Sequence, residues 1–378
     1  MTRRITAPPA GAARSALSAA DARAVAPALV TWQRLHGRHD LPWQGSRDPY
    51  RVWLSEVMLQ QTQVATVCGY YARFLARFPD VAALAAAPLD EVLGLWAGLG
   101  YYSRARNLHR CAHLVMTQHG GAFPRSAAVL AELPGIGAST AAAIAAFCFD
   151  ERISILDGSV KRVLARLLGF GEDLASARNV RSLNEWAQAL LPIDTADMPA
   201  YTQGLMDLGA TVCLPREARC EVCPWQRLCV AHAEGRPCAY PQRSRKASRQ
   251  ATENWCLWLA DASGAVWLQQ RPTPGIWAGL WAWPMYDHDA ACRAAAATVI
   301  RLARGAADAI GVEALEGFKH VLTHRDWTMH PRRLVVSSAD VLPADVLAES
   351  LGPGRWWPRA ALAGLGLPAP LRQRLPIA

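Results

Sequence analysis

Apolar side chains recur every three or four residues along most of the first 231 positions of the chain. From Val25 to about Ala231, repeating Ala, Leu and Val positions are interrupted by short turn-forming stretches such as RFPD, GGAFP and LPGIG. This spacing places the apolar residues on one face of successive α-helices, and Gly and Pro mark the helix ends. The pattern predicts an all-α domain over residues 25–237.

The hydrophobic pattern changes near residue 254. The stretch WCLWLADASGAVWLQQRP alternates apolar and polar positions around a turn sequence, which predicts a β-hairpin. An Ala-rich helix near 289–304 and the strand-like RRLVVSS follow it. We therefore expect a second, smaller α+β domain over residues 254–372.

Two segments show no apolar periodicity. Residues 1–24 are rich in Ala, Arg and Pro and contain no aromatic side chain, so we expect a disordered tail. A transit peptide is the alternative for this segment. Residues 238–253 combine Pro, Ser and a basic run, which predicts an exposed linker between the two domains.

Composition agrees with two globular domains, because the chain has 378 residues, of which 52% are hydrophobic and 19% charged. The 40 Lys and Arg exceed the 31 Asp and Glu, and the formal charge of +9 favours a polyanionic partner such as DNA, RNA or a membrane surface. No apolar run reaches the roughly 20 residues of a membrane-spanning helix, and no compact apolar signal peptide is present. These features predict a cytoplasmic protein.

Four of the ten cysteines lie in one short segment, CLPREARCEVCPWQRLC, with the spacing C-x6-C-x2-C-x5-C. Four thiolates in one loop can hold a single metal centre. Four-cysteine zinc sites usually combine two C-x2-C pairs, whereas this segment has one, so an iron-sulfur cluster is favoured over zinc and over a chance group of buried cysteines. The predicted ligands, in a loop over residues 213–229, are Cys213, Cys220, Cys223 and Cys229.

A glycine-rich turn joins two predicted helices in AELPGIGASTAAAIAAF. The backbone amides around Gly135 and Gly137, with the start of the following helix, form a candidate anion site that a DNA phosphate would fit. A tight connection between helices that binds nothing is the alternative.

Two carboxylates lie in unlike surroundings. Glu56 stands in the middle of the apolar, helix-compatible WLSEVMLQQTQV, where burial of a charge is costly. Asp157, in ILDGSVKRVLARLLG, can cap a helix that begins near Ser159. A protonated acid in an apolar site and an ionised carboxylate in a polar one suit the cleavage of a glycosidic bond. A solvated Glu56 and a purely capping Asp157 are the alternatives.

These motifs together resemble a known enzyme family. The cysteine spacing is similar to the [4Fe-4S] loop of the endonuclease III superfamily of DNA glycosylases, and LPGIG is similar to its helix-hairpin-helix signature. WLSEVMLQQTQV, LWAGLGYYSRARNLH, LPGIGAST and ILDGSVKRVLAR resemble, in this order, the MutY-type adenine DNA glycosylases. That family removes adenine mispaired with 8-oxoguanine or guanine, and the resemblance covers residues 25 to about 370.

The resemblance implies catalytic roles in the first domain. Glu56 would protonate adenine, and Asp157 would stabilise the oxocarbenium-like sugar or bond to it transiently. Tyr101 would lie near the scissile nucleotide. Ser159 stands where the family usually has Asn, which puts the reaction rate in doubt, and Ser139 stands where bifunctional relatives carry a lysine nucleophile.

Further residues acquire binding roles from the same resemblance. Gln60 and Gln61 would probe the duplex near the lesion, with Gln61 at the intercalating position, and Lys161 on the helix behind Asp157 is another candidate DNA contact. Ordinary core packing is the alternative role for Trp43 and Tyr101. The implied adenine-pocket residues are Leu41, Trp43, Ser139 and Gln203.

The second domain resembles the Nudix-like domain with which the family recognises 8-oxoguanine. Where the family has Phe-Ser-His, this chain has Leu322, Thr323 and His324, which keeps the hydroxyl and the imidazole and loses the Phe contact. The helix ACRAAAATVIRLARGAADAIG lacks the glutamates of Nudix hydrolases, so we expect no nucleotide hydrolysis. A metal site at His320, His324 and His330 is disfavoured because no Cys or carboxylate cluster accompanies them.

The sequence thus predicts a mainly α, two-lobed helix-hairpin-helix glycosylase domain with a [4Fe-4S] loop, followed by a smaller α+β Nudix-like domain. We expect a monomeric, monofunctional adenine glycosylase that acts on double-stranded DNA with A:8-oxoguanine or A:G mispairs and has no membrane partner. An endonuclease III-like glycosylase and lyase is the alternative enzyme, opposed by Glu56 and Ser139. A catalytically silent DNA-binding protein with a redox-sensing cluster is the alternative from another class.

Overall fold

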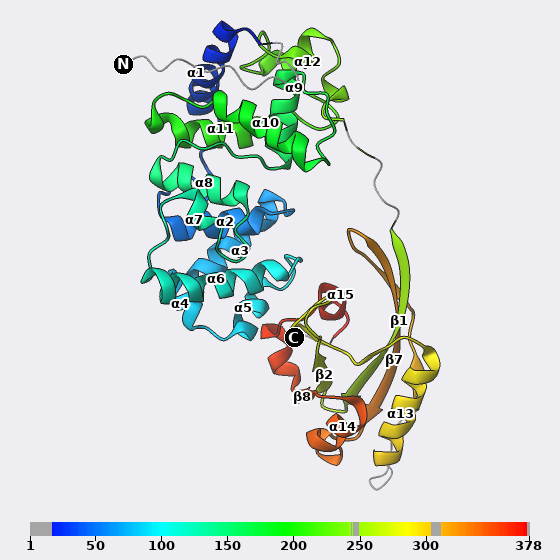
Figure 1. The fold of residues 1–378 in the computed structure, drawn as a ribbon. Coiled ribbons are helices and arrows are strands. Elements are labelled where there is room, and N and C mark those ends of the chain that lie inside the picture. The colour runs from blue at the N-terminus through cyan, green and yellow to red at the C-terminus, as the bar shows by residue number, and fades with distance from the viewer. Residues whose placement is uncertain (1–16, 243, 245–248, 304–310, 376–378) are drawn as a thin grey trace. The chain divides into compact units, whose positions relative to one another are not determined.

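The computed structural model describes residues 17–242, 244, 249–303 and 311–375 (Figure 1). The chain divides into two compact units, Met1–Ala82 with Arg110–Arg245, and Ala83–His109 with Lys246–Ala378. The predicted α-helical and α+β classes are both found, but residues 83–109 belong to the unit that contains the sheet.

The first unit is helical. Its long helix α11 (Met198–Thr211) packs against α1 (Ala19–His36), α8 (Ala138–Phe149) and α9 (Gly158–Leu168), and their apolar faces form one core. The other elements of this unit are α2 (Pro49–Leu59), α3 (Val64–Arg77), α7 (Ala127–Leu130), α10 (Ala177–Ala189), α12 (Val230–Ala233), η1 (Thr195–Asp197), η2 (Cys220–Val222) and η3 (Pro237–Ala239). Helices α4 (Val81–Ala86) and α6 (Ser103–His119) cross the boundary between the units.

Helix α1 begins at Ala19, so the prediction of a disordered tail over residues 1–24 is wrong for residues 19–24. The Ser18 hydroxyl accepts a hydrogen bond from the Asp21 amide at 3.1 Å and caps the helix. The helix continues into a core face that starts at Val25, so its first turn is the extension of a buried element. Residues 1–16 lie outside the described residues.

The second unit contains a mixed sheet with the order β3-β2-β1-β7-β5, to which β4, β6 and β8 are added by pairing with β1, β7 and β2. The central strands β1 (Gln250–Asp261) and β7 (Arg325–Val336) are parallel, and the other described pairs are antiparallel. The remaining strands are β2 (Val266–Gln270), β3 (Trp281–Ala282), β4 (Met285–Tyr286), β5 (Glu313–Ala314), β6 (Phe318–Val321) and β8 (Arg355–Trp357). The helical elements are α5 (Leu89–Trp96), α13 (Asp289–Ala303), α14 (Ala344–Leu351), α15 (Ala369–Arg372), η4 (Ala339–Val341) and η5 (Arg359–Gly364).

The core of the second unit lies between the sheet and α13, which runs alongside β1 and β7 (Figure 1). Leu257 and Leu259 of β1 lie in one core cluster with Val299 of α13, and the alternation of the strand puts both leucines on the same face. The predicted hairpin is present, since Ala260 pairs with Val266, and so are the predicted Ala-rich helix and the RRLVVSS strand.

Strand β1 starts within the segment predicted to be a linker over residues 238–253. Gln250 pairs with Arg325, and the parallel ladder with β7 continues to Asp261. Backbone hydrogen bonds extend this strand through polar positions, which an apolar periodicity does not reveal. Within the described residues, none of the helices has both the length and the apolar character needed to cross a membrane.

The segment 83–109 joins the second unit through close backbone packing. A Cβ added to Gly94 of α5 would lie 2.1 Å from the carbonyl oxygen of Gly364, so only glycine allows this approach. The Tyr102 hydroxyl donates to the Leu367 carbonyl at 3.2 Å, and Arg106 donates to the Ala278 carbonyl at 2.5 Å. These contacts span more than 170 positions of sequence, beyond the reach of a local pattern.

Candidate active site

One pocket in the first unit is lined from several elements. Glu56 reaches it from α2, Leu41 and Trp43 from the loop between α1 and α2, and Gln203 from α11. Three of the four residues predicted to form an adenine pocket therefore line the same cavity, and Ser139 does not belong to its lining. The other lining residues are Arg38, Gln44, Gly45, Ser46, Val52, Ser55, Leu59, Val64, Phe147 and Met206.

The local sequence of α2 fixes the position of Glu56. Asp48 caps the helix by accepting from the Tyr50 amide at 2.9 Å, and Pro49 stands in the first turn, where its missing N–H costs nothing. Glu56 keeps a partial exposure and lines the pocket. Burial, followed by the negative charge of Asp157, raises the pKa of Glu56 to about 8. The side chain is therefore protonated at neutral pH.

Asp157 is the other carboxylate of the predicted pair, and it is exposed. It caps α9 by accepting from the Val160 amide at 2.6 Å, and the Ser159 hydroxyl donates to it at 2.9 Å. Ser159 packs against Gly209 of α11, where an added Cβ would lie 3.0 Å from the serine Oγ. The serine that departs from the usual family sequence thus still donates a hydrogen bond to the candidate catalytic carboxylate.

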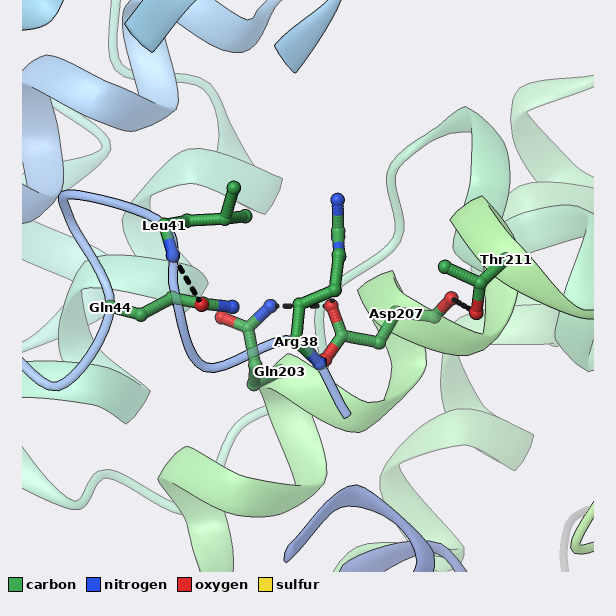
Figure 2. A network of polar contacts seen from close by, with 6 residues as sticks. All are labelled: Arg38, Leu41, Gln44, Gln203, Asp207 and Thr211. Carbon is green, nitrogen blue, oxygen red and sulfur yellow. Dashed lines mark hydrogen bonds and ion pairs between the residues drawn. The ribbon is translucent and has the colours of Figure 1, made fainter. Parts of the chain in front are cut away.

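A buried polar network holds the Gln203 side chain (Figure 2). Asp207 is fully buried and accepts from the Arg38 amide at 3.0 Å, from Arg38 Nε at 2.7 Å and from Gln203 Nε2 at 2.8 Å. In the loop after α1, Gln44 Oε1 accepts from the Leu41 amide at 3.2 Å. The sequence analysis missed Arg38, Gln44 and Asp207. The available signal was the spacing of four between Gln203 and Asp207, which puts both on one helix face.

The predicted phosphate site is the turn between α7 and α8. Gly135 has a φ of +79°, which favours glycine, and Gly137 is the N-cap residue of α8. Gly137 and Ala138 are exposed, so the first turn of α8 is accessible to an anion. The Ser139 hydroxyl accepts from the Leu156 amide at 3.3 Å and thereby joins this turn to the residue before Asp157.

The predicted DNA contacts at the end of α2 lie beside this turn. Gln60 Nε2 donates to the Thr140 hydroxyl of α8 at 3.4 Å. Gln61 is exposed and has a φ of +58°, a left-handed conformation that few side chains adopt. Lys161 is partly exposed in the first turn of α9. Gln60 and Gln61 thus directly follow the helix that carries Glu56, and Lys161 lies in the helix that Asp157 caps.

The four predicted ligand cysteines line a second cavity of the first unit, which also includes Arg166 and Trp225. Within the described residues, no group of three or more His, Cys, Asp or Glu side chains is arranged to hold a metal ion. A single zinc ion requires its ligands to converge on one point, whereas the thiolates of an iron-sulfur cluster bind different iron atoms. Four cysteine thiols in one loop with a single C-x2-C pair are a donor set that fits an iron-sulfur cluster.

Arg166 is 2% exposed and directs its guanidinium group at the cysteine loop. It donates from Nη1 to Cys213 Sγ at 3.3 Å and to the Leu214 carbonyl at 2.7 Å. It also donates from Nη2 to the Pro215 carbonyl at 3.1 Å and from Nε to the Tyr240 carbonyl at 3.2 Å. A buried cation thus contacts a predicted ligand sulfur, holds the first residues of the loop and also binds the segment that follows the loop at Tyr240.

Comparison with known proteins matches two parts of the chain to family models. Residues 54–189 match the model of the HhH-GPD superfamily of base excision DNA repair proteins, and residues 255–375 match that of the NUDIX domain. A solved thermostable thymine-DNA glycosylase is similar in fold, with a TM-score of 0.50 and 26% identity over 57% of this chain and 98% of that one.

Curated relatives share most of the length of the chain. It is 33% identical to the adenine DNA glycosylase of Buchnera aphidicola subsp. Baizongia pistaciae, over 83% of this chain and 86% of the relative. It is 39% identical to the adenine DNA glycosylase of Mus musculus, over 70% of this chain and 61% of the relative. The chain belongs to the adenine DNA glycosylase family.

This membership confirms the predicted fold class and enzyme class. The protein is a base excision repair glycosylase that releases adenine by hydrolysing its N-glycosidic bond. The HhH-GPD match lies within the first predicted domain, and the NUDIX match starts at the second residue of the second predicted domain and ends three residues beyond its predicted end at 372.

The second unit of the glycosylase carries the remaining predicted site residues. Thr323 and His324 are exposed at the tip of the hairpin between β6 and β7, which Leu322 closes by donating its amide to the Arg325 carbonyl at 2.7 Å. The Thr323 hydroxyl lies 3.0 Å from the hydroxyl of Tyr101, in the same unit. Tyr101 is 46% exposed and has a φ of +47°. The structure therefore places Tyr101 with the predicted recognition hairpin.

Proposed function

We propose that the pocket lined by Glu56 receives an adenine flipped out of the duplex and that Glu56 protonates this base as the glycosidic bond breaks. One observation carries the proposal: a carboxylic acid with a pKa of about 8 lines a cavity that also presents Leu41, Trp43 and Gln203. A general acid is most effective when its pKa is close to the working pH. The bonding electrons leave with the protonated base, and positive charge develops on the sugar.

Asp157 would stabilise that positive charge. It is exposed at the start of α9, and its negative charge acts on Glu56, so the two carboxylates are close enough to interact. An acid in an apolar site and a solvated carboxylate beside it divide the two roles of glycosidic cleavage. Water then completes the reaction and leaves an abasic site.

The test is adenine release from short duplexes that contain A opposite 8-oxoguanine, A opposite guanine and A opposite thymine. We expect release from both mispairs and little from the A:T pair. Because Ser139 occupies the lysine position of bifunctional relatives, borohydride should trap no covalent adduct. Release of an oxidised pyrimidine, or a trapped adduct, would contradict the proposal.

We infer that the tip of the β6–β7 hairpin recognises the 8-oxoguanine opposite the adenine. The support is the exposure of Thr323 and His324 and the 3.0 Å separation of the Thr323 and Tyr101 hydroxyls, which limits the orientations of both groups. Thr323→Val removes the hydroxyl and keeps the shape. We expect it to lower the preference for 8-oxoguanine over guanine by about 3-fold to 10-fold, the value of one hydrogen bond. Thr298→Val on α13 is the matched control, and an unchanged preference in Thr323→Val would oppose this role.

The duplex itself would be held by its phosphates. The exposed first turn of α8 at Gly135 and Gly137, together with Lys161, offers amides and a positive charge, and Gln60 and Gln61 are positioned at the adjacent end of α2. We further expect a monomer that is cytoplasmic and nucleoid-associated through this binding. Affinity for duplex DNA should fall steeply with salt, and sedimentation of the complex should give one chain per duplex.

We propose that the cysteine loop binds a [4Fe-4S] cluster through Cys213, Cys220, Cys223 and Cys229. Four cysteine ligands leave no open iron position for a substrate, so the bound cluster would supply structure and charge rather than take part in hydrolysis. Iron and sulfide analysis together with visible absorbance of the purified protein tests this proposal. A stoichiometric zinc content without sulfide would contradict it.

A further inference from the structure

Tyr101 combines an exposed aromatic ring with a backbone conformation that few side chains adopt. Its φ of +47° lies in the left-handed region, where the Cβ of an L-residue is crowded. Gly98 and Gly100, which precede it, have φ values of +105° and +73°. A tyrosine persists in this conformation only where its surroundings hold it there. The contacts of residues 98–101 must therefore supply that hold.

Arg104, in the first turn of α6, binds the backbone on both sides of Tyr101. Its buried guanidinium group donates from Nη2 to the carbonyls of Leu99 and Gly100, each at 3.2 Å. Its backbone amide donates to the Tyr101 carbonyl at 2.8 Å. The peptide group before Tyr101 and the peptide group after it are both fixed, and these two groups define the φ and ψ of the tyrosine.

Two aromatic rings flank the same guanidinium group. The Arg104 Cζ lies 5.3 Å from the ring centroid of Trp96 in α5 and 5.6 Å from that of Tyr101, distances at which a cation is attracted to the face of a ring. Trp96 is fully buried, and its Nε1 donates to the Gly100 carbonyl at 3.2 Å. Trp96 thus anchors Arg104, and Arg104 contacts both the backbone and the ring of Tyr101.

We propose that Arg104 is a positioning residue for mispair recognition: it holds Tyr101 in the left-handed conformation, which keeps the tyrosine hydroxyl beside that of Thr323 before DNA binds. The two hydroxyls lie 3.0 Å apart within the second unit. Because Arg104 is buried, its effect on a duplex passes through Tyr101. A side chain that is already ordered in the free protein does not have to be ordered by the ligand, which favours binding. The inference rests on the proposed recognition of 8-oxoguanine by the tip of the β6–β7 hairpin.

The first experiment is a double-mutant cycle between Arg104→Met and Tyr101→Ala. Adenine release is measured under single-turnover conditions at subsaturating enzyme, and the rate opposite 8-oxoguanine divided by the rate opposite guanine gives the preference. We expect Arg104→Met to lower this preference about 3-fold to 10-fold in the unmodified protein and less than about 2-fold in Tyr101→Ala, because the residue on which Arg104 acts is then missing. Arg110→Met, on the exposed surface of α6, is the control and should leave the preference unchanged.

The outcomes of this cycle separate the inference from the function on which it rests. Equal losses of preference in both backgrounds, or no loss in either, would overturn the positioning role of Arg104. If Thr323→Val also left the preference unchanged, the proposed recognition by the hairpin tip would fail with it. Arg104→Lys should lie between Arg104→Met and the unmodified protein, since lysine keeps the charge and loses the planar fork of donors. The lysine variant gives the same comparison if the methionine variant folds poorly.

The second experiment observes Tyr101 directly in the full chain without DNA. With 3-fluorotyrosine at position 101 alone, we expect one ¹⁹F resonance, displaced from that of the unfolded protein, and the same resonance in Arg110→Met. In Arg104→Met the resonance should move toward the position of the unfolded protein, because the ring is no longer held, and Arg104→Lys should restore part of the displacement. A lower unfolding temperature of Arg104→Met with an unchanged resonance would show that Arg104 only stabilises the loop, and would overturn the proposal.

Discussion

Two cavities of the helical unit each contain an arginine that is hydrogen-bonded to the protein, and they differ in which polar atoms are paired. In the cysteine-lined cavity, Arg166 donates from all three guanidinium nitrogens to protein acceptors. In the Glu56 pocket, Arg38 is committed to Asp207, yet Gln44 Nε2 has no partner in the described part of the chain. The polar contacts of the first cavity are satisfied around its arginine, whereas the second leaves one buried donor unpaired.

The polar groups of the Glu56 pocket lower the stability of the fold. An unsatisfied buried donor costs on the order of 1–3 kcal/mol. A carboxylic acid whose pKa is raised to about 8 is also a poor contributor to stability once it ionises. The Glu56 pocket carries both costs. Variants in the Glu56 pocket should therefore change the rate of adenine release. Variants in the cysteine-lined cavity should instead change the retention of the proposed cluster.

The largest effect is expected from Glu56→Gln, which keeps the shape of the side chain and removes its proton donor. Single-turnover adenine release should fall about 10³-fold, within the range of general acid catalysis. Iron content should not change, since Glu56 does not line the cysteine cavity. Glu185→Gln on the exposed surface of α10 is the control. Full activity of Glu56→Gln would exclude Glu56 as the acid.

Asp157 separates a structural role from a chemical one, and its effect on rate should be the second largest. Asp157→Asn keeps an oxygen that can accept from the Val160 amide, so unfolding midpoints should shift little. The loss of negative charge should still lower adenine release by roughly 10²-fold, about 2.7 kcal/mol of transition-state stabilisation. Asp157→Ala should lose the cap as well, at a cost of about 1 kcal/mol of stability. Equal rates for Asp157→Asn and the unmodified protein would reduce Asp157 to a helix cap.

The pH dependence of the reaction should follow the protonation of Glu56. Because its pKa is raised from 4.5 to about 8, the acid form persists at neutral pH, and single-turnover rates should fall tenfold per unit above about 8. The free energy of unfolding should change with pH in the same direction as the rate. The protonated side chain contributes stability that is fully present below pH 4.5 and is lost as the pH rises through 8. Glu56→Gln should therefore gain stability relative to the unmodified protein between these values, and a constant difference across this range would contradict a raised pKa.

Local patterns in the sequence predicted much of this molecule. The helical periodicity, the β1–β2 hairpin and the cysteine spacing all depend on neighbours within a few residues, and the structure contains each element. Glu56 was identified because a charge in an apolar helix face is conspicuous in a local pattern. The predicted start of helix α1 is too late, because its cap, Ser18, precedes the apolar residues that reveal the helix.

Long-range partners were not predictable in this way. Arg38 and Asp207 are separated by 169 positions, and no pattern indicates that they pair. Gln44 was overlooked for the same reason, since only the fold reveals that one end of its amide is committed and the other is buried. Residues 83–109 have a helical pattern like their neighbours, but whether they pack with helices or with a sheet depends on distant backbone, such as the Gly364 carbonyl that approaches Gly94.

Arg166→Met tests the role of the cysteine-lined cavity, and of these variants it should have the smallest effect on the rate of adenine release. Removing the guanidinium leaves the carbonyls of Leu214, Pro215 and Tyr240 without this donor, and it removes a positive charge beside Cys213. We expect loss of the iron-sulfur absorbance to a chelator to accelerate about 10-fold, since outer contacts of metal ligands contribute about that much to retention. Arg166→Lys should be intermediate, because lysine keeps the charge and loses the fork of donors.

The matched variant in the Glu56 pocket is Gln44→Met. It should lower the rate of adenine release and leave cluster retention unchanged. Adenine release per loaded molecule should change less than about 3-fold in Arg166→Met, whereas Gln44→Met should keep its iron-sulfur absorbance and lose activity. A loss of rate in fully loaded Arg166→Met would show that the cysteine-lined cavity also controls the chemistry. The two cavities would then not have separate roles in cluster retention and adenine release. Helix α9 would be the physical link between them, because it carries Asp157 at its start and Arg166 in its last turn.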